Sequence, residues 1–311
     1  MVALPSGPAR APLIAPSILR TYGLRSAIVF VVMILAVGAG AQLLREAAIG
    51  EVIGLRKGYA GDYGPAISAW LDTPGGIAVA PDGDIYFSDS NNAVVRHIDA
   101  KTSVITPIAG NHDLGAGFSG DGGLAIRARL DSPDGVAIAP DGALLVADSY
   151  NQRIRRIDPK TGVITTVAGS GVADFNGDGL PALETHLDQP VAVACAPNGD
   201  IYIADTMNNR VRRVDHVTGL VTTVAGDGEV AEEGPIGDGG PATAAHLFMP
   251  SDIALAPNGD LYIADMHHNR IRRVDARSHV ITTVAGTGAF ADNGDGGPAT
   301  AASLEIGRAH V

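Results

Sequence analysis

The sequence has 311 residues, enough for one or two domains, with 18% charged and 5% aromatic residues. Its 40 glycines and 19 prolines suit many short strands joined by turns, and they exclude a charge-rich disordered chain and a Leu/Ala/Glu/Lys-rich helical protein. The net charge of −12 argues against a general nucleic-acid binder, and the single cysteine, Cys195, excludes an intramolecular disulfide and a CxxC zinc site.

The N-terminal segment has the pattern of a targeting sequence. Residues 1–25 contain basic residues and no acidic one, and Ser26–Leu44 is a run without charge. As a helix, this run would span about one bilayer core, and the basic flank before it predicts translocation of the chain that follows. The small residues at 39–41 also suit a cleavage site. We expect a cleaved signal peptide or a transmembrane anchor, an extracytoplasmic location, and membrane contact only through this helix.

Two motifs recur in step along the rest of the chain. The segment Asp148-Ser-Tyr-Asn-Gln-Arg-Ile-Arg-Arg-Ile-Asp158 recurs at 205–215 and 265–275, and more loosely at 89–99, so the repeat is about 59 residues long. Gly-Asp-Gly-Gly-Pro-Ala-Thr-Ala-Ala stands at 237–245 and again at 294–302. We therefore expect one tandem-repeat domain over residues 48–304.

Each repeat carries four short strand patterns followed by a long connector. In the third repeat the strands are predicted at 191–195, 200–204, 210–214 and 220–225, with the tight-turn sequence Pro-Asn-Gly between the first two. The connector can form one helical turn that starts at proline. Four antiparallel strands per repeat predict an all-β fold, a β-propeller.

The core Asn-Arg-[Val/Ile]-Arg-Arg-[Val/Ile]-Asp, which follows a Leu-Tyr-Ile-Ala-Asp strand, resembles the NHL repeat. The longer unit with the Gly-Asp-Gly-Gly-Pro-Ala-Thr-Ala-Ala connector is similar to exported bacterial NHL proteins. This resemblance covers residues 48–304. It implies a six-bladed propeller that works mainly as a binding platform. Related six-bladed propellers include lactonases, amidating lyases and sensor domains of membrane kinases, so the resemblance predicts fold better than function.

The propeller of this sequence is expected to be partial. Six blades of this period need about 350 residues, and four full blades can be recognised. Residues 48–53 match a fourth strand and should complete a further blade. Residues 305–311 depart from the repeat and match the translation of a common sequencing adapter. We therefore expect a non-native tail on a C-terminally truncated chain.

The residues that repeat in every blade are expected to be structural. An aspartate ends each second strand before a turn that contains Asn, where it can accept turn N–H bonds; a metal-binding ring is the alternative. The arginines of the third strands, Arg153, Arg155 and Arg156 in the second repeat and their counterparts in the third and fourth, are expected to pair with nearby aspartates rather than bind polyanions. Strict alternation along the third strand would place Ile154 and Ile157 on opposite faces; a bulge, or buried arginine stems with exposed heads, would resolve this. These repeat positions are Asp89, Asp148, Asp205, Asp265, Arg153, Arg210 and Arg270.

One connector contains a possible calcium ligand set. Asp174, Asn176 and Asp178 match the opening of a calcium loop, but Thr185 at the twelfth position excludes an EF-hand. An ordinary Gly-rich turn and a partial calcium site remain as alternatives, and we expect no other cofactor. Cys195 aligns with apolar residues of the other repeats and is expected in the core.

The position before the connector leucine varies while its surroundings repeat. The side chains at this position suit a ligand-binding or peptide-binding rim, and the two histidines among them could alternatively share a metal. The rim residues are Trp70, Arg129, His186 and His246.

The sequence thus favours an exported propeller that binds a protein, peptide or glycan and does not bind nucleic acid. Two alternatives remain: a metal-dependent enzyme of the lactonase or lyase type, and a sensor domain of a larger membrane protein. Outside the repeated motifs, the sequence shows no Ser/His/Asp triad, phosphate-binding loop or paired-carboxylate motif. A binding module is therefore favoured over an enzyme.

Overall fold

The computed structural model describes residues 56–231 and 234–306, which form one compact unit. Its regular elements are β-strands and single 3₁₀ turns, so the all-β prediction is confirmed. Within these residues, no helix has the length and apolar character needed to cross a bilayer. The predicted hydrophobic helix at 26–44 and strand at 48–53 lie outside the described residues, as do residues 307–311 of the predicted tail.

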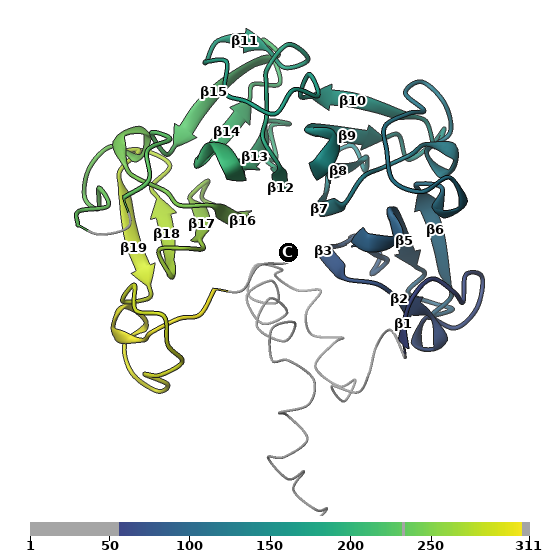
Figure 1. Cartoon of the computed structure of the whole chain (residues 1–311), viewed down its shortest axis with the longest axis horizontal. Coiled ribbons are helices and arrows are strands. Elements are labelled where there is room, and N and C mark those ends of the chain that lie inside the picture. Colours follow the sequence, from purple (N-terminus) through teal and green to yellow (C-terminus); the bar gives the residue numbers. More distant parts are fainter. Residues whose placement is uncertain (1–55, 232–233, 307–311) are drawn as a thin grey trace, which may run out of the picture. The chain divides into compact units, whose positions relative to one another are not determined.

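Four antiparallel sheets, each of four main strands joined in sequence order, form the blades of a propeller (Figure 1). Blade 1 consists of β3 (Pro74–Val79), β4 (Ile85–Asp89), β5 (Val94–Ile98) and β6 (Ile105–Ala109). Blade 2 consists of β7 (Pro133–Ile138), β8 (Leu144–Asp148), β9 (Arg153–Ile157) and β10 (Ile164–Ala168). Blade 3 consists of β12 (Pro190–Cys195), β13 (Ile201–Asp205), β14 (Arg210–Val214) and β15 (Leu220–Ala225). Blade 4 consists of β16 (Pro250–Leu255), β17 (Leu261–Asp265), β18 (Arg270–Val274) and β19 (Ile281–Ala285).

Short strands from the connectors add to this framework. β11 (Leu180–Pro181) pairs with the outer strand β15 of blade 3. β1 (Arg56–Lys57) and β2 (Trp70–Leu71) form a separate parallel pair before blade 1. The connectors also contain the predicted helical turns, which are 3₁₀ turns at Ala66–Ser68, Ala125–Arg127, Ala242–Ala244 and Ala299–Ala301. Six blades were expected for the complete propeller, and the described part of the chain contains four.

Both faces of an inner blade are buried, because each blade packs against a neighbour on either side. Ile157 of blade 2 packs with Val95 and Ala109 of blade 1, whereas Ile154 packs with Val193 and Ile203 of blade 3. Because successive side chains of a strand point to opposite faces, the apolar side chains of one strand enter two different cores. The opposite placement of Ile154 and Ile157 is thus a property of the propeller and needs no exposed arginine heads.

The third strand of each blade faces a bulge in the fourth. In blade 2, Arg155 is opposite Thr166 and Ile154 is opposite Ala168, so Val167 is the extra residue. The expectation of exposed arginine heads is wrong for Arg155, which is fully buried. The head of Arg156 on the other face is partly exposed.

Close approach of backbones, and one hydroxyl from each of blades 1 to 3, join neighbouring blades. A Cβ on Gly135 of β7 would lie 2.7 Å from the Cα of Ala192 in β12, so this position admits no side chain. The Ser149 hydroxyl, just after β8, donates to the main-chain oxygen of Pro190 in blade 3 at 2.7 Å. Blades 1 and 3 make the same bond through Ser90 and Thr206, whereas blade 4 has Met266 at this position.

The antiparallel strand order assigns the loops to two faces. The turns between second and third strands and the first part of each connector lie on one face, which we call the turn face. The middle of a connector runs along the fourth strand of the next blade to the turn before that strand, as Ala182 does when its N–H donates to the oxygen of Gly219. The turns between first and second strands and between third and fourth strands lie on the opposite face. The side chain of Asn151, in the turn after β8, donates to the oxygen of Gly117 in the preceding connector at 2.8 Å. The connectors therefore cross the turn face beside the turns.

Candidate functional site

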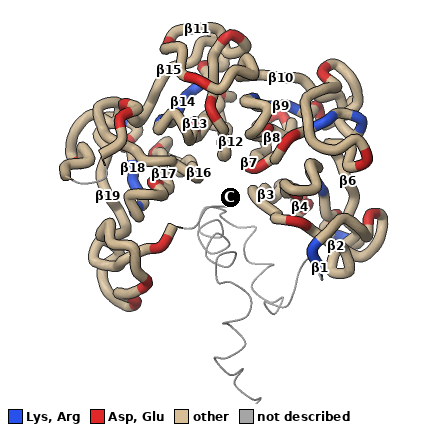
Figure 2. The backbone as a smooth tube through the Cα atoms, in the orientation of Figure 1, with Lys and Arg blue, Asp and Glu red and all other residues tan. Residues whose placement is uncertain are grey.

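A buried arginine anchors each blade to the connector on the turn face. In blade 2, Arg155 contacts Asp148 at 2.9 Å through Nη1 and Asp121 of the connector at 2.8 Å through Nη2. Arg155 and Asp148 have no exposed side-chain surface. Figure 2 shows the basic positions on the third strands β9, β14 and β18. The equivalent buried arginines are Arg96, Arg212 and Arg272.

The second-strand aspartates hold the turn and the arginine together. Asp148 accepts the main-chain N–H of Asp131 at 2.8 Å and the side-chain amide of Asn151 at 2.9 Å, besides Arg155. Asp89 and Asp205 receive the same three kinds of donor, and Asp265 receives a His in place of the Asn. Among the described residues, no group of three His, Cys, Asp or Glu side chains is placed to hold a metal.

The first arginine of the third strand has a different role from the one expected. Arg153 donates to the main-chain oxygens of Asn151 at 2.7 Å and Ser170 at 2.8 Å, and its guanidinium lies 3.8 Å from the centre of the Phe118 ring. It therefore braces the turn against the connector through carbonyls rather than carboxylates. Arg210 makes the same contacts with Asn208, Asp227 and Phe175, and Arg270 binds the oxygens of His268 and Thr287.

Blade 4 replaces the turn asparagine by His268, a buried imidazole. Its Nδ1 lies 2.8 Å from Asp265 Oδ2 and its Nε2 lies 2.8 Å from the oxygen of Ala231. Because both neighbours are acceptors, both ring nitrogens must carry a proton to satisfy them. Burial opposes that charge and Arg272 repels it, but the bonds to Asp265 and Ala231 outweigh both and raise the pKa of His268.

The raised pKa predicts that blade 4 loses stability as the pH rises above neutral. A raised histidine pKa stabilises the folded state fully below the unfolded value of about 6.5, and that contribution is lost as the pH rises through the folded pKa. The variant His268→Asn restores the residue of blades 1 to 3 and should remove this loss. Thermal unfolding of both proteins from pH 6 to pH 9 measures it; parallel curves would contradict the charged imidazole.

The rim residues expected to bind a ligand brace their own connectors. Arg129 donates to the oxygens of Gly115 and Ala116. His246 Nδ1 lies 2.9 Å from Asp227, and His186 Nδ1 lies 4.0 Å from Asp174. The ring of Trp70 is covered by the guanidinium of Arg56 at 5.6 Å. In the described structure these four residues lie on different connectors, and no contact joins one to another.

The predicted calcium ligands have protein partners. Asp178 accepts from Arg212 at 2.9 Å and from the Thr223 hydroxyl at 3.0 Å. Asn176 caps the connector by donating to the oxygen of Glu184 and accepting the N–H of His186. In this conformation Asp178 serves the arginine anchor of blade 3, so a calcium ion would compete with Arg212.

Cys195 ends the inner strand β12 and packs partly buried against the core between blades 2 and 3. Burial raises the pKa of its thiol to about 11. The thiol is therefore protonated at neutral pH and behaves as a small apolar side chain.

The turn face exposes large apolar side chains that the sequence analysis did not single out. Leu114, Val172 and Val230 stand at similar places in three successive connectors and are 56%, 49% and 46% exposed. Tyr150 and Met207, at the tips of the turns in blades 2 and 3, are 57% and 43% exposed. The signal for the turn tips was available: blades 1 to 4 have Asn, Tyr, Met and His there inside an otherwise repeating motif.

Acidic side chains accompany these apolar residues. Asp131 and Asp188 precede the inner strands of blades 2 and 3 and are partly exposed, and burial raises the pKa of both carboxyl groups. Asp113 and Glu229 lie in the connectors close in sequence to Leu114 and Val230. The turn face therefore combines apolar tips with negative charge.

Comparison with known proteins identifies the repeat. The family model of the teneurin NHL domain matches residues 115–174, and that of the NHL repeat matches residues 249–274. Teneurin-1 of Mus musculus is 32% identical over 238 residues, which cover 70% of this chain and 8% of teneurin-1. NHL repeat-containing protein 2 of Bos taurus is 33% identical over 196 residues, which cover 59% of this chain and 27% of that protein. The chain thus spans only a small part of these relatives.

Among solved structures, a structural genomics protein of unknown function from Bacteroides thetaiotaomicron VPI-5482 superimposes with a TM-score of 0.47 at 24% identity. The superposition covers 67% of this chain and 46% of that one.

Proposed function

Because the chain is an NHL-repeat β-propeller, we propose that it is a binding module whose turn face captures a protein or peptide partner. The observation that carries the proposal is the set of large apolar side chains exposed on this face, above all Leu114, Val172 and Val230. Exposed apolar groups gathered on one face are typical of interaction sites. The partner would bridge several blades at once.

The frame beneath these side chains supports the same function. Each blade holds its connector through a buried arginine and two carboxylates, as Arg155 does with Asp148 and Asp121. The rim residue Arg129 braces the connector segment next to Leu114 through Gly115 and Ala116. A braced loop loses little conformational entropy on binding, which favours affinity. The rim residues would then act by positioning the exposed side chains.

The charge of the face suggests the partner's chemistry. Asp131, Asp188 and Glu229 accompany the apolar residues, and the chain carries a net charge of −12. A segment with basic side chains between aromatic or aliphatic ones complements such a face. The uncharged run at 26–44 behind a basic flank supports a meeting with this partner outside the cytoplasm.

Selection from a displayed random-peptide library tests the proposal. Peptides enriched by the wild-type protein should be rich in Lys or Arg and in apolar residues. The triple variant Leu114→Ser/Val172→Ser/Val230→Ser should weaken their binding by about ten-fold or more, because it removes the apolar contacts. Fluorescence anisotropy with a synthesised peptide measures the change in Kd.

A matched variant tests whether the effect belongs to the turn face. Ile67, Leu183 and Val217 are 50%, 58% and 77% exposed. Val217 lies in a turn on the opposite face, and Ile67 and Leu183 lie in the middle of connectors, beside turns of that face. The variant Ile67→Ser/Leu183→Ser/Val217→Ser removes a similar exposed apolar area and should leave the Kd within about two-fold. Equal weakening by the two triple variants, or no enrichment by the wild-type protein, would refute the turn face as the binding surface.

A further inference from the structure

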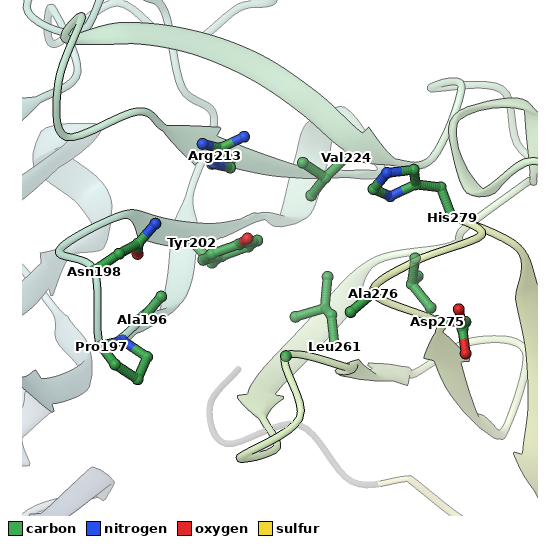
Figure 3. Close-up of a pocket in the computed structure, with 12 residues that line it drawn as sticks. Ala196, Pro197, Asn198, Tyr202, Arg213, Val224, Leu261, Asp275, Ala276 and His279 are labelled. Carbon is green, nitrogen blue, oxygen red and sulfur yellow. The ribbon is translucent and has the colours of Figure 1, made fainter.

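A groove opens between blades 3 and 4 on the face opposite the turn face, with a volume of about 400 Å³ (Figure 3). Its blade 3 wall includes Tyr202, Arg213 and Val224, and its blade 4 wall includes Leu261, Val274 and His279. We call it the seam groove. Leu261 and Val274 are nearly fully buried and form an apolar floor. The volume lies within the range of small-molecule sites.

His279 marks this groove as different from the other seams. It lies in the turn between β18 and β19 with φ +55°, a conformation that glycine adopts without strain. The same turn has Gly162 in blade 2 and Gly219 in blade 3, both at positive φ. Blade 4 thus keeps a bulky imidazole where glycine would be easier to accommodate, and Figure 3 shows it at the edge of the seam groove.

The opposite wall supplies a phenol at the same seam. Tyr202 aligns with Tyr86 of blade 1 and Leu145 of blade 2. The seam between blades 1 and 2 therefore has the phenol with Gly162, and the seam between blades 2 and 3 has Leu145 with Gly219. Of the three seams in the described structure, only the one between blades 3 and 4 has an imidazole on the turn between third and fourth strands opposite the phenol. The imidazole at the seam between blades 1 and 2 is His97, which lies against Tyr86 itself and is held by Asp84 at 2.7 Å.

The polar groups of the seam groove select an uncharged ligand. Arg213 is held by Asp200 and Asp215 at 2.8 Å each, so its charge is compensated and its guanidinium is fixed as a flat wall. The side chains of Tyr202 and His279 have no hydrogen-bond partner within residues 56–231 and 234–306. The Tyr202 hydroxyl and the His279 imidazole are the two free polar groups that the described residues place in the groove. Together with the flat guanidinium and the apolar floor, they match an aromatic ring that carries one polar substituent.

We propose that the seam groove binds a neutral aromatic ring bearing a hydroxyl group, with Tyr202 and His279 hydrogen-bonded to that hydroxyl. The hydroxyl can accept from the Tyr202 O–H and donate to an imidazole nitrogen. The ring would lie on Leu261 and Val274 beside the guanidinium of Arg213. This site is independent of the turn face.

Saturation-transfer NMR with p-cresol tests the proposal on the full chain. The wild-type protein should bind p-cresol with a Kd of about 1 mM, as suits so small a ligand. Toluene, which lacks the hydroxyl, and 4-hydroxybenzoate, which adds a charge, should each bind about five-fold or more weakly. Absence of saturable binding of p-cresol, or equal or tighter binding of either analogue, would overturn the proposal.

Two variants taken from the other blades assign the contacts. His279→Gly introduces the residue of blades 2 and 3 and relieves the positive φ, so Tm should hold or rise while p-cresol binding weakens about five-fold. Tyr202→Leu introduces the residue of blade 2 and should weaken binding similarly. Tyr86→Leu makes the same change at the seam between blades 1 and 2 and should leave binding unchanged. Wild-type binding by both His279→Gly and Tyr202→Leu would overturn the assignment.

Discussion

Replacing Arg155 by Met is expected to lower the free energy of unfolding by about 3–5 kcal/mol, because a buried carboxylate then loses its cation. Arg155 and Asp148 are both fully buried and lie 2.9 Å apart. Met can fill part of the space of the arginine stem, but it leaves the charge of Asp148 uncompensated. Urea unfolding at neutral pH, followed by circular dichroism, measures the loss.

The neighbouring residue provides the control for this substitution. The side chain of Arg156 is 30% exposed and contacts Asp141 and Asp158, so Arg156→Met should cost at most about 1 kcal/mol. The double variant Arg155→Met/Asp148→Asn should recover part of the loss, because it removes the unpaired charge. Equal losses for Arg155→Met and Arg156→Met would contradict the buried anchor.

Replacing Gly169 by Ala is expected to lower the free energy of unfolding by about 3 kcal/mol, because the new methyl group has no space. Gly169 follows β10 with φ +92°, and a Cβ there would lie 2.2 Å from the oxygen of Gln152 and 2.9 Å from the Cα of Arg153. Both contacts are with backbone, so the bulge of β10 and the turn before β9 would have to separate. Thermal and urea unfolding measure the effect.

A second glycine separates this clash from backbone strain. Gly122 has φ +80°, and a Cβ there would meet no heavy atom within 4 Å. Gly122→Ala should therefore show the strain of positive φ alone, about 1 kcal/mol. The difference between the two variants measures the close approach after β10. If both variants lose the same stability, strain rather than packing explains Gly169.

The blades were predictable because their signals are local. The strand predicted at 200–204 is Ile201–Asp205 in the structure, and the one predicted at 210–214 has the same bounds. Pro-Asn-Gly at 197–199 defines the turn between β12 and β13, and the connector alanines form the expected 3₁₀ turns. Turn residues and period-two patterns act within a few residues of the chain. Recurrence in four copies then removed the ambiguity of any single strand.

The roles of individual side chains were less predictable, because neighbouring blades decide them. Arg153 and Arg155 look alike in sequence and both lie over the ring of Phe118, but only Arg155 is fully buried and meets Asp121. The aspartate motif that recurs in step with the arginines was a usable signal for this pairing. Nothing local showed that Arg129 would bind its own connector, or that His279 would face Tyr202 across a seam. These contacts join residues that are brought together only by blade packing.

The hydrogen bonds that hydroxyl groups make from one blade to the next also affect how a row of blades can evolve. Ser149 donates to a main-chain oxygen of the next blade, as Ser90 and Thr206 do. Every residue type carries that oxygen, so the bond demands no particular sequence from its neighbour. A unit copied or exchanged by recombination would find an acceptor next to almost any other unit. Gene duplication can therefore supply new blades ready to dock, while the exposed tips of each copy diverge independently.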